Sequence, residues 1–561
     1  MNNFEKILAK ILLSIVTMLI FQNTTLFSQV QPEWHNRFNS AWGLTDFGRK
    51  LRISVDGNIY IGGHSFDEGN STAVTTLIKY DQSGNTIWQE HSQPGVFDYI
   101  EDIVLDSKEN LYSVGDYWNG NDFDVLVTKH DRGGNLLWRS TFNGGYWDRA
   151  RKIDIDSEGS VYICGHTWYQ PEFYNILLVK FDSAGQYIWN RTYTSEGQHS
   201  DFGHTLKIDQ SNFIYVSGYT MQDHVLLKYS SNGDTLWQKS FNTNKEWMDI
   251  EQSHMELDNQ NNIIICGNFY SQASQEDILV LKYDHIGNLL WNKKWNSQGN
   301  NRDMVSFQAS TDNAIATDQN GNIFVSGTME NPGISFGEDI VTLKYNPEGV
   351  LQWQHIYDGP ANDWDNPLSV TVDRFGDVYV CGFTVEIVNS LVPEDYLTFK
   401  LNGNTGTLLW KEIFNGIGNF SDRAYSIGVD EDLNVYVTGI TSNDNSISSS
   451  NRDIITIKYS QTIVGITANS EIPGTFQLHQ NFPNPFNPQT TIAFDIAKET
   501  RVTLKVYDLI GREVSTLINE NMKPGNYSVK FDGRNLPSGL YISKLTTLEG
   551  IAITRRMMLL K

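Results

Sequence analysis

Cysteine is scarce in this chain and is never paired in sequence. Only three cysteines occur among the 561 residues, and each directly precedes a glycine: YICG (Cys164), IICG (Cys266) and YVCG (Cys381). No Cys-x-x-Cys motif is present, and the three lie in parts of the chain that do not adjoin one another. A small side chain on a packed strand explains the position better than a disulfide or a metal ligand. The residues that stand before the corresponding glycine in other parts of the chain are Gly62, Val114, Ser217, Ser326 and Thr438.

Positive charge is also in short supply. The chain has 42 Lys and Arg against 66 Asp and Glu, a net charge of −24. Residues 1–28 carry +1 and residues 463–561 carry +3, so residues 29–462 carry about −28. Such acidity argues against nucleic acid as a partner, because phosphates need a cationic surface. It is compatible with solubility outside the cell, or with cations and neutral sugars as ligands.

Long apolar runs are absent beyond the N-terminus. Lys6 and Lys10 precede an apolar run, residues 11–21, that is too short to span a bilayer comfortably. We interpret residues 1–28 as a signal peptide with cleavage near Ser28, which predicts Sec export and no transmembrane segment in the mature chain. The leader lacks cysteine, which argues against a lipoprotein.

Familiar catalytic motifs are missing as well. The chain has no G-x-S-x-G elbow, no H-E-x-x-H and no P-loop, and its 12 histidines are scattered. No catalytic residue is therefore assigned. Carboxylate pairs for glycoside cleavage would converge only in three dimensions, so an acid-dependent enzyme stays open as an alternative.

Internal repetition, by contrast, is abundant. A strand ending in glycine recurs, and so does the pattern K-Y/F-D-x-x-G-N-x-x-W, each at intervals of about 50 to 60 residues. This period is close to one propeller blade. The strand-ending glycines are Gly63, Gly115, Gly165, Gly218, Gly267, Gly327, Gly382 and Gly439. The tryptophans are Trp88, Trp138, Trp189, Trp237, Trp291, Trp353 and Trp410.

Each unit resolves into four strands, but one unit is incomplete. Eight third strands carry a lysine near their end, whereas only seven are followed by a tryptophan strand. The missing strand matches EWHNRF around Trp34. An open ring would leave exposed strand edges. We therefore predict an all-β, eight-bladed β-propeller with four-stranded blades over residues 29–462, in which the N-terminal strand closes the last blade.

The fixed spacing of the tryptophans points to a structural role. Each lies four residues after its turn glycine, as in Gly84 and Trp88. A ligand site would not need eightfold repetition, so we expect the indoles to pack between neighbouring blades.

The repeat resembles the secreted bacterial β-propeller repeat (SBBP) family over roughly residues 34–460. The motif D-x-x-G-N-x-Y-x-x-G followed by D-x-x-x-x-K-Y-D-x-x-G-N-x-x-W carries this resemblance. It implies the fold but no activity, because the family has none in common. The tryptophan motif is also similar to that of eight-bladed quinoprotein dehydrogenases, but the adjacent cysteine pair common in those enzymes is absent.

The C-terminal region, residues 476–561, resembles the type A sorting domain of the type IX (Por) secretion system. The matching segments include LHQNFPNPFNPQTTIAFDI, VTLKVYDLIGREV and the terminal RRMMLLK. We expect a small Ig-like β-sandwich after a linker at 463–475. The resemblance implies a Bacteroidetes-type envelope and the type IX machinery as a partner through residues 476–561. It also implies a secreted or outer-surface location after outer-membrane translocation, with the domain either cleaved or exchanged for an anchor.

Candidate ligand-binding residues lie in the connections of variable length, which emerge on one face of the ring. An aspartate stands near the start of most innermost strands, and tryptophans accompany several of these acids. The acids could accept sugar hydroxyls or a hard cation while the indoles stack on sugars; alternatively, each aspartate caps the loop before its strand. The aspartates are Asp46, Asp98, Asp148, Asp201, Asp249, Asp365 and Asp422. The tryptophans are Trp42, Trp118, Trp147, Trp168, Trp247 and Trp364.

These features favour a non-enzymatic, exported binding or adhesion module for a glycan or a protein. A polysaccharide hydrolase or lyase using carboxylates on that face is one alternative, and a structural surface or matrix component is another. No cofactor is expected; calcium suits the acids, but no motif supports it.

Overall fold

The structure is a computed structural model of the chain. It describes residues 30–560 except for 41–44, 67–72, 92–97, 170–172, 198, 221–222, 243–252, 272–274, 298–300, 306–311, 332–336, 362, 386–392, 419–420, 444–450, 462–474, 482–483, 535 and 549. The predicted signal peptide lies outside the described residues. The chain divides into two compact units, Met1–Gln461 and Thr462–Lys561. Within the described residues there is no helix with the length and apolarity needed to cross a membrane.

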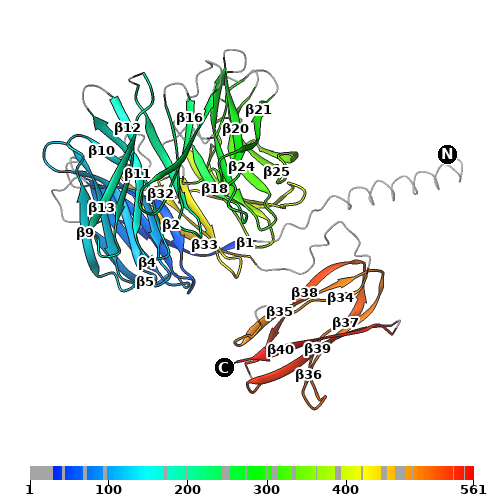
Figure 1. Cartoon of the computed structure of the whole chain (residues 1–561). Coiled ribbons are helices and arrows are strands. Elements are labelled where there is room, and N and C mark those ends of the chain that lie inside the picture. The colour runs from blue at the N-terminus through cyan, green and yellow to red at the C-terminus, as the bar shows by residue number, and fades with distance from the viewer. Residues whose placement is uncertain are drawn as a thin grey trace, which may run out of the picture. The chain divides into compact units, whose positions relative to one another are not determined.

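Unit 1 is a ring of eight antiparallel sheets, as predicted (Figure 1). Each blade runs from an innermost to an outermost strand, and the first four blades are continuous in sequence. Blade 1 is β2 (Asp46–Ile53), β3 (Ile59–Phe66), β4 (Ala73–Tyr80) and β5 (Thr86–His91). Blade 2 is β6 (Asp98–Leu105), β7 (Leu111–Trp118), β8 (Phe123–His130) and β9 (Leu136–Phe142). Blade 3 is β10 (Asp148–Ile155), β11 (Val161–Tyr169), β12 (Phe173–Phe181) and β13 (Tyr187–Tyr193). Blade 4 is β14 (Phe202–Ile208), β15 (Ile214–Tyr219), β16 (Asp223–Tyr229) and β17 (Thr235–Asn242).

Blades 5 and 7 are built in the same way, whereas blades 6 and 8 differ in how their strands are supplied. Blade 5 is β18 (His254–Leu257), β19 (Ile263–Ser271), β20 (Gln275–Tyr283) and β21 (Leu289–Trp295). Blade 6 has a divided inner strand, β22 (Asp303–Met304) and β23 (Ile315–Thr317), followed by β24 (Ile323–Glu330), β25 (Glu338–Tyr345) and β26 (Leu351–Tyr357). Blade 7 is β27 (Asn366–Val372), β28 (Val378–Val385), β29 (Glu394–Leu401) and β30 (Leu408–Phe414). Blade 8 is β31 (Arg423–Val429), β32 (Val435–Ser442), β33 (Arg452–Gln461) and the N-terminal β1 (Val30–Phe38).

The N-terminal strand closes the ring, which confirms the strand count made from the sequence. β1 pairs antiparallel with β33 from Val30 opposite Gln461 to Phe38 opposite Ile454. Val30 and Phe38 are buried. Blade 8 therefore has four strands like the others, apart from the divided inner strand of blade 6, and the seam lies between the third and fourth strands of blade 8.

The middle strands of each blade are apolar because neighbouring blades cover both faces. In β28, for example, every residue is buried, whereas residues of the outermost β26 are exposed or partly buried except for Tyr357. The apolar cores lie between blades, and one of them joins Leu51 and Ile61 of blade 1 to Tyr436 and Ile454 of blade 8. Such burial is the main force that holds the ring together.

The repeated tryptophans dock each blade onto the next, as their fixed spacing predicted. The carbonyl of Gln82, in the last turn of blade 1, accepts from Trp34 Nε1 and from Lys458 Nζ, both at 3.1 Å. A turn glycine makes room for the indole, because a Cβ on Gly84 would lie 2.7 Å from the Trp34 ring. In other blades the equivalent tryptophan and lysine donate in the same way to the carbonyls of Arg132, Ser183, Pro347 and Gly403.

The seam replaces this turn carbonyl with a side chain. Blade 8 has no turn at the equivalent place, because its outermost strand comes from the N-terminus. The Oε1 atom of Gln461 accepts instead from Lys400 Nζ at 3.2 Å and from Trp410 Nε1 at 3.3 Å. Its Nε2 atom donates to Leu433 O at 2.8 Å. The docking contact is thus kept at the one blade whose strands come from both ends of the propeller sequence.

Unit 2 consists of two small sheets that share one apolar core. In β35, buried residues alternate with more exposed ones, so one face of its sheet turns inward. Phe494, Leu504 and Leu545 are fully buried in the shared core. The first sheet is β34 (Gln477–Leu478), β35 (Gln489–Ile496) and β38 (Gly525–Asp532); the second is β37 (Glu513–Met522), β36 (Thr500–Asp508), β39 (Gly539–Thr547) and β40 (Ala552–Leu559).

Candidate functional site

The ring of aspartates faces into the protein. Each described member is at most 1% exposed and accepts the backbone N–H of a residue in the preceding loop, at 2.5 to 2.7 Å. These are the bonds expected of a residue that caps a loop. The pairs are Asp46 with Ser40, Asp148 with Gly144, Asp201 with Ser195, Asp303 with Ser297, Asp365 with Gly359 and Asp422 with Gly416.

Blade 6 supplies a further aspartate, Asp303, which makes the same bond although it does not keep the spacing of the other seven from the turn after the inner strand. The displacement arises because the insertion of blade 6 follows Asp303, between β22 and β23, rather than preceding it. Of the remaining candidates, Asp98 begins β6, but its side chain is not described. Trp42, Trp247 and Asp249 lie outside the described residues.

Burial makes these carboxyls weaker acids than an exposed aspartate. It raises the pKa of Asp46, Asp148, Asp303 and Asp365 to about 6, although hydrogen bonds from neighbouring groups oppose the shift. At Asp148 the negative charges of Asp124 and Asp122 raise the pKa further. An ionised carboxylate at these positions is therefore a cost to the fold at neutral pH.

Asp148→Asn tests this consequence directly. The raised pKa makes wild-type stability fall as the pH rises from about 4, the unfolded value, to about 6. The amide keeps an acceptor for Gly144 and cannot ionise. Relative to the wild type, the variant is expected to gain about 2–3 kcal/mol in unfolding free energy between pH 4 and pH 8. Urea unfolding at both pH values measures this; a difference independent of pH would show that Asp148 has an ordinary pKa.

Three of the predicted tryptophans do come together. Trp118 ends β7, Trp147 precedes β10 and Trp168 lies near the end of β11, so blades 2 and 3 supply them. They are 38%, 36% and 36% exposed, and Tyr146 beside them is 41% exposed. We call these four residues the aromatic surface.

Ring contacts make the aromatic surface continuous. Phe123 links two of its indoles, with ring centroids 5.1 Å from Trp118 and 6.0 Å from Trp147. Trp147 and Trp168 meet at 6.0 Å and 83°, and Tyr146 lies 6.4 Å from Trp168. The rings hold one another in place, so they are ordered before any ligand arrives. Sequence reasoning missed Tyr146 and Phe123 because neither belongs to the repeat.

An arginine and polar side chains border these rings. Arg149 stacks 4.0 Å from the centroid of Phe123 and donates to Asp116 at 2.7 Å. Asn119 and Asn121 are exposed in the loop that follows Trp118. Aromatic faces flanked by amide groups can bind a ligand that is apolar on its faces and carries hydroxyls at its edges.

Trp364 lies apart from this group, between blades 6 and 7. It is 45% exposed and pairs as an isolated bridge with Glu338. The adjacent Asp365, with Asp339 and Asp358, offers carboxylate oxygens that all lie within 4.8 Å of one another. Among the described residues this is the set of acids placed to share an ion.

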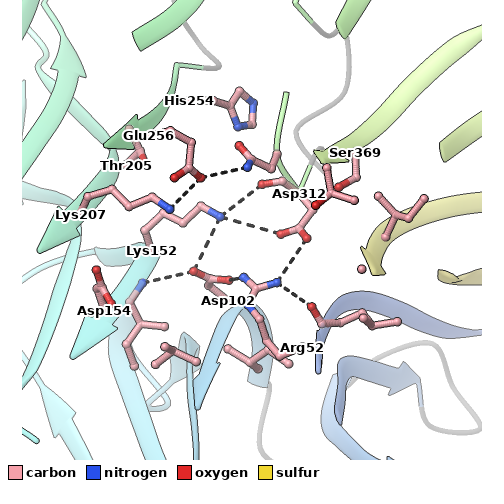
Figure 2. A pocket seen from close by; sticks show the side chains of 18 of the residues that line it. Arg52, Asp102, Lys152, Asp154, Thr205, Lys207, His254, Glu256, Asp312 and Ser369 are labelled. Carbon is pink, nitrogen blue, oxygen red and sulfur yellow. Dashed lines mark hydrogen bonds and ion pairs between the residues drawn. The ribbon is translucent and has the colours of Figure 1, made fainter. Parts of the chain in front are cut away.

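The axis of the propeller holds a charged cavity that the sequence did not reveal. Its volume is about 400 Å³, and residues from the innermost strand or segment of all eight blades line it. Figure 2 shows lysine, arginine and carboxylate side chains pointing towards one another across it. Two inner strands carry these charges at alternate positions, Lys50 and Arg52 in β2 and Lys152 and Asp154 in β10, whereas the other strands give no such local signal. The charged groups are Lys50, Arg52, Lys152, Lys207, Asp102, Asp154, Glu256 and Asp312.

Asp312 is the hub of this network. Its carboxylate lies 3.0 Å from Lys50 Nζ, 3.3 Å from Arg52 Nη1 and 3.9 Å from Lys152 Nζ, and it accepts from Ser426 Oγ at 2.6 Å. Burial alone would raise the pKa of Asp312, but these cations outweigh it and hold the pKa well below its usual range. One side chain of blade 6 thereby binds blades 1, 3 and 8.

The remaining channel charges are neutralised locally. Lys207 Nζ lies 2.8 Å from Glu256 Oε1, and Arg52 Nη2 lies 2.8 Å from Asp102 Oδ1. Burial lowers the pKa of His254, on the cavity wall, to about 3, so this ring is uncharged at neutral pH. Cations and carboxylates paired in this way stabilise the ring and leave no excess charge of one sign for a ligand.

The three cysteines are buried, which agrees with their predicted role as small residues on packed strands. Each is a free thiol. Burial raises the pKa of Cys164, Cys266 and Cys381 above the ordinary value, which makes the thiols poor nucleophiles and ligands.

Comparison with known proteins identifies the C-terminal unit. Residues 480–559 match the family described as the secretion system C-terminal sorting domain. This segment is a type IX secretion sorting domain. It directs translocation across the outer membrane by the type IX machinery, so the protein is secreted or held at the cell surface.

The propeller is similar to several proteins at low sequence identity. An uncharacterized WD repeat-containing protein of Acanthamoeba polyphaga mimivirus is 26% identical over 195 residues, which are 28% of this chain and 13% of that protein. Sqt1 from Chaetomium thermophilum has a TM-score of 0.46 at 10% identity over 77% of this chain and 99% of that chain. The polysaccharide lyase Uly1 has a TM-score of 0.42 at 10% identity over 77% and 100% of the two chains. At these scores the likenesses carry no functional argument.

Proposed function

We propose that this protein is a non-enzymatic glycan-binding propeller, delivered by the type IX system to the cell surface or beyond. The observation that carries the proposal is the aromatic surface of Trp118, Tyr146, Trp147 and Trp168. Monomeric proteins rarely expose several large rings in contact unless they bind something. Indole faces stack on the apolar faces of sugar rings, and the exposed amide of Asn121 suits a sugar hydroxyl. The Asn119 amide holds this loop instead, through bonds to Asp122, Asp124 and two backbone N–H groups.

The charge of the propeller favours a neutral glycan over an acidic one. Residues 29–462 carry about −28, and Asp116, Asp122 and Asp124 lie close to the aromatic surface. A uronate or sulfate group would be repelled there. A protein ligand remains the alternative occupant, and glycans are favoured because the rings form an open surface edged by amides.

A polysaccharide hydrolase or lyase has less support. The described aspartates of the ring are buried and hydrogen-bonded to backbone. The carboxylates of the channel are paired with cations, except for Asp154, which accepts from two backbone N–H groups. Neither group offers a free acid beside the aromatic surface, and Asp122 and Asp124, which do lie there, are buried and accept hydrogen bonds from Asn119. Incubation with polysaccharides should therefore yield neither new reducing ends nor unsaturated products; turnover of any substrate would favour the enzyme.

A glycan panel with tryptophan variants tests the proposal. The mature chain is expected to bind at least one neutral polysaccharide in affinity electrophoresis. Trp147→Ala combined with Trp168→Ala should weaken that binding by about 2 kcal/mol or more, roughly thirtyfold, because central tryptophans dominate binding energies.

Trp364→Ala is the matched control. It removes an exposed indole from a different pair of blades and should leave glycan affinity unchanged. Equal binding by the wild type and the double variant would refute the aromatic surface as the site. Binding of protein ligands alone would refute the glycan class.

A further inference from the structure

The innermost strands of the propeller present one ring of side chains at a single level of the axial channel. In each blade this residue stands opposite the residue that precedes the strand-ending glycine. The ring consists of Lys50, Asp102, Lys152, Thr205, His254, Ser369 and Ser426. In blade 6 the place is held by Ala314, whose carbonyl accepts from Ser326 N at 3.0 Å.

Blades 8, 1 and 2 fill their side of this level with bonded groups. Ser426 Oγ donates to Asp312 at 2.6 Å, and Lys50 Nζ lies 3.0 Å from the same carboxylate. Asp102 pairs with Arg52 at 2.8 Å. The hydrogen bonds of these groups are therefore made within the protein.

Blades 4, 5 and 7 contribute polar groups that the protein leaves unbonded. Thr205, His254 and Ser369 are only 3%, 7% and 3% exposed, and all three line the axial cavity (Figure 2). Within the part of the chain that the structure describes, no hydrogen bond or ion pair involves these side chains. Buried polar groups nearly always have a hydrogen-bond partner. These three need one from inside the cavity.

Lys152, in the neighbouring blade 3, adds a donor with spare capacity. Its Nζ atom donates to Asp312 O at 3.3 Å, and the carboxylates of Asp102 and Asp312 lie 3.7 and 3.9 Å away. These distances are longer than the about 2.7–2.9 Å of a good charge-assisted bond. Both bonds that Glu256 accepts from described residues end on its Oε1 atom. The cavity thus offers donors and acceptors together.

The balance of charge around the cavity disfavours a charged guest. Four cations and four carboxylates surround it. An anion bonded to Lys152 would stand beside Asp102 and Asp312, and a cation bonded to Glu256 would stand beside Lys207. Such repulsions are strong where little water screens them. A hydroxyl group carries no charge and both donates and accepts, so it suits these groups.

We propose that the axial cavity binds a small neutral polyhydroxylated molecule, of the size of a monosaccharide, through Lys152, Thr205, His254 and Ser369. Its volume of about 400 Å³ falls within the range of small-molecule sites, about 300–1,000 Å³. None of the four residues of the aromatic surface lines the cavity. The site is therefore distinct from the glycan surface and does not depend on it.

An NMR titration of the mature chain tests the site. The probes are D-glucose, D-galactose, L-rhamnose and myo-inositol, and the reporters are the ring ¹H–¹³C signals of the histidines. His254 is the one histidine among the described residues that line the cavity, and the loss of its signals in His254→Gln assigns them. At least one probe should shift the His254 signals to saturation, whereas the signals of His479, in the C-terminal unit, should stay in place.

A double variant removes hydroxyls from the cavity without changing its charge. Thr205→Val combined with Ser369→Ala should weaken binding of that probe at least tenfold, because two hydrogen bonds are lost. Thr398→Val is the matched control. Thr398 is buried in β29 but does not line the cavity, so this variant should bind the probe as the wild type does.

The same titration separates this site from the glycan surface. Trp147→Ala combined with Trp168→Ala should leave the His254 shift intact even where it abolishes polysaccharide binding. The proposal is overturned if no probe shifts the His254 signals of the wild type, which would show that the cavity takes water alone. It is equally overturned if the double hydroxyl variant binds the probe as tightly as the wild type.

Discussion

A chain that lacks residues 30–38 is expected to lose the cooperative melting of the whole propeller rather than a terminal appendage. These residues are the outermost strand of blade 8, and they pair with β33 along their full length. Loss of the buried Val30 and Phe38 alone removes about 4 kcal/mol of apolar burial. That is a large part of a typical folding free energy of about 5–15 kcal/mol. The deletion also removes Trp34 from its contact with the turn of blade 1.

Differential scanning calorimetry of the mature chain with and without residues 30–38 measures this effect. A synthetic peptide of residues 30–38 provides the control, because it should restore part of the transition by rebuilding the strand in trans. An unchanged melting temperature for the propeller transition would mean that the ring does not depend on its seam.

Asp312→Asn should destabilise the propeller by about 3–5 kcal/mol at pH 7, the usual cost of breaking a buried ion pair from one side. The substitution removes the carboxylate that pairs with Lys50, and it leaves Arg52 and Lys152 with Asp102 as their remaining close carboxylate. The folded-state pKa of Asp312 is depressed, so its contribution is fully present above about pH 4 and is lost as the pH falls below that value. Urea unfolding at pH 7 and pH 3 measures both effects.

Glu256→Gln is the control for this prediction. It lies in the same channel and removes the same charge, but it pairs with one cation, Lys207, whose side chain is 34% exposed. A loss below about 1 kcal/mol is expected, as for other partly exposed pairs. Equal losses in the two variants would mean that Asp312 has no special place in the network.

The ring and its closure could be predicted from the sequence because they rest on counting. Eight glycine-ended strands and seven tryptophan strands leave one strand missing, and Trp34 supplies it. The docking role of the tryptophans followed in the same way, since a constant spacing reflects a constant contact. Repeats allow such features to be predicted, because the same physical requirement recurs in every blade.

The channel network could not be predicted, because its partners come from different blades. Asp312 stands in an insertion that breaks the repeat, and no local pattern places it opposite Lys50 and Lys152. The aspartate ring shows the converse difficulty. Its spacing located the acids, but the spacing cannot tell whether a carboxylate turns outward to a ligand or inward to a backbone N–H.

The aromatic surface was partly foreseen. Trp118, Trp147 and Trp168 stood out as irregular tryptophans in the variable loops, but only the folded chain shows that Phe123 and Tyr146 connect them. Trp364, selected on the same grounds, lies beside the acids of blades 6 and 7. Loop residues of this kind converge through the arrangement of blades, which the sequence of a single loop does not encode.

The most direct test of the glycan-binding surface is an NMR titration of the mature chain with ¹⁵N-labelled tryptophan, using the best neutral glycan of the panel. The indole N–H signals of Trp118, Trp147 and Trp168 should shift on binding. Those of the docking residues Trp34, Trp88 and Trp138 should stay in place, because they are bonded to turn carbonyls. Shifts confined to Trp364 or to the docking tryptophans, with the aromatic surface unperturbed, would contradict the proposal.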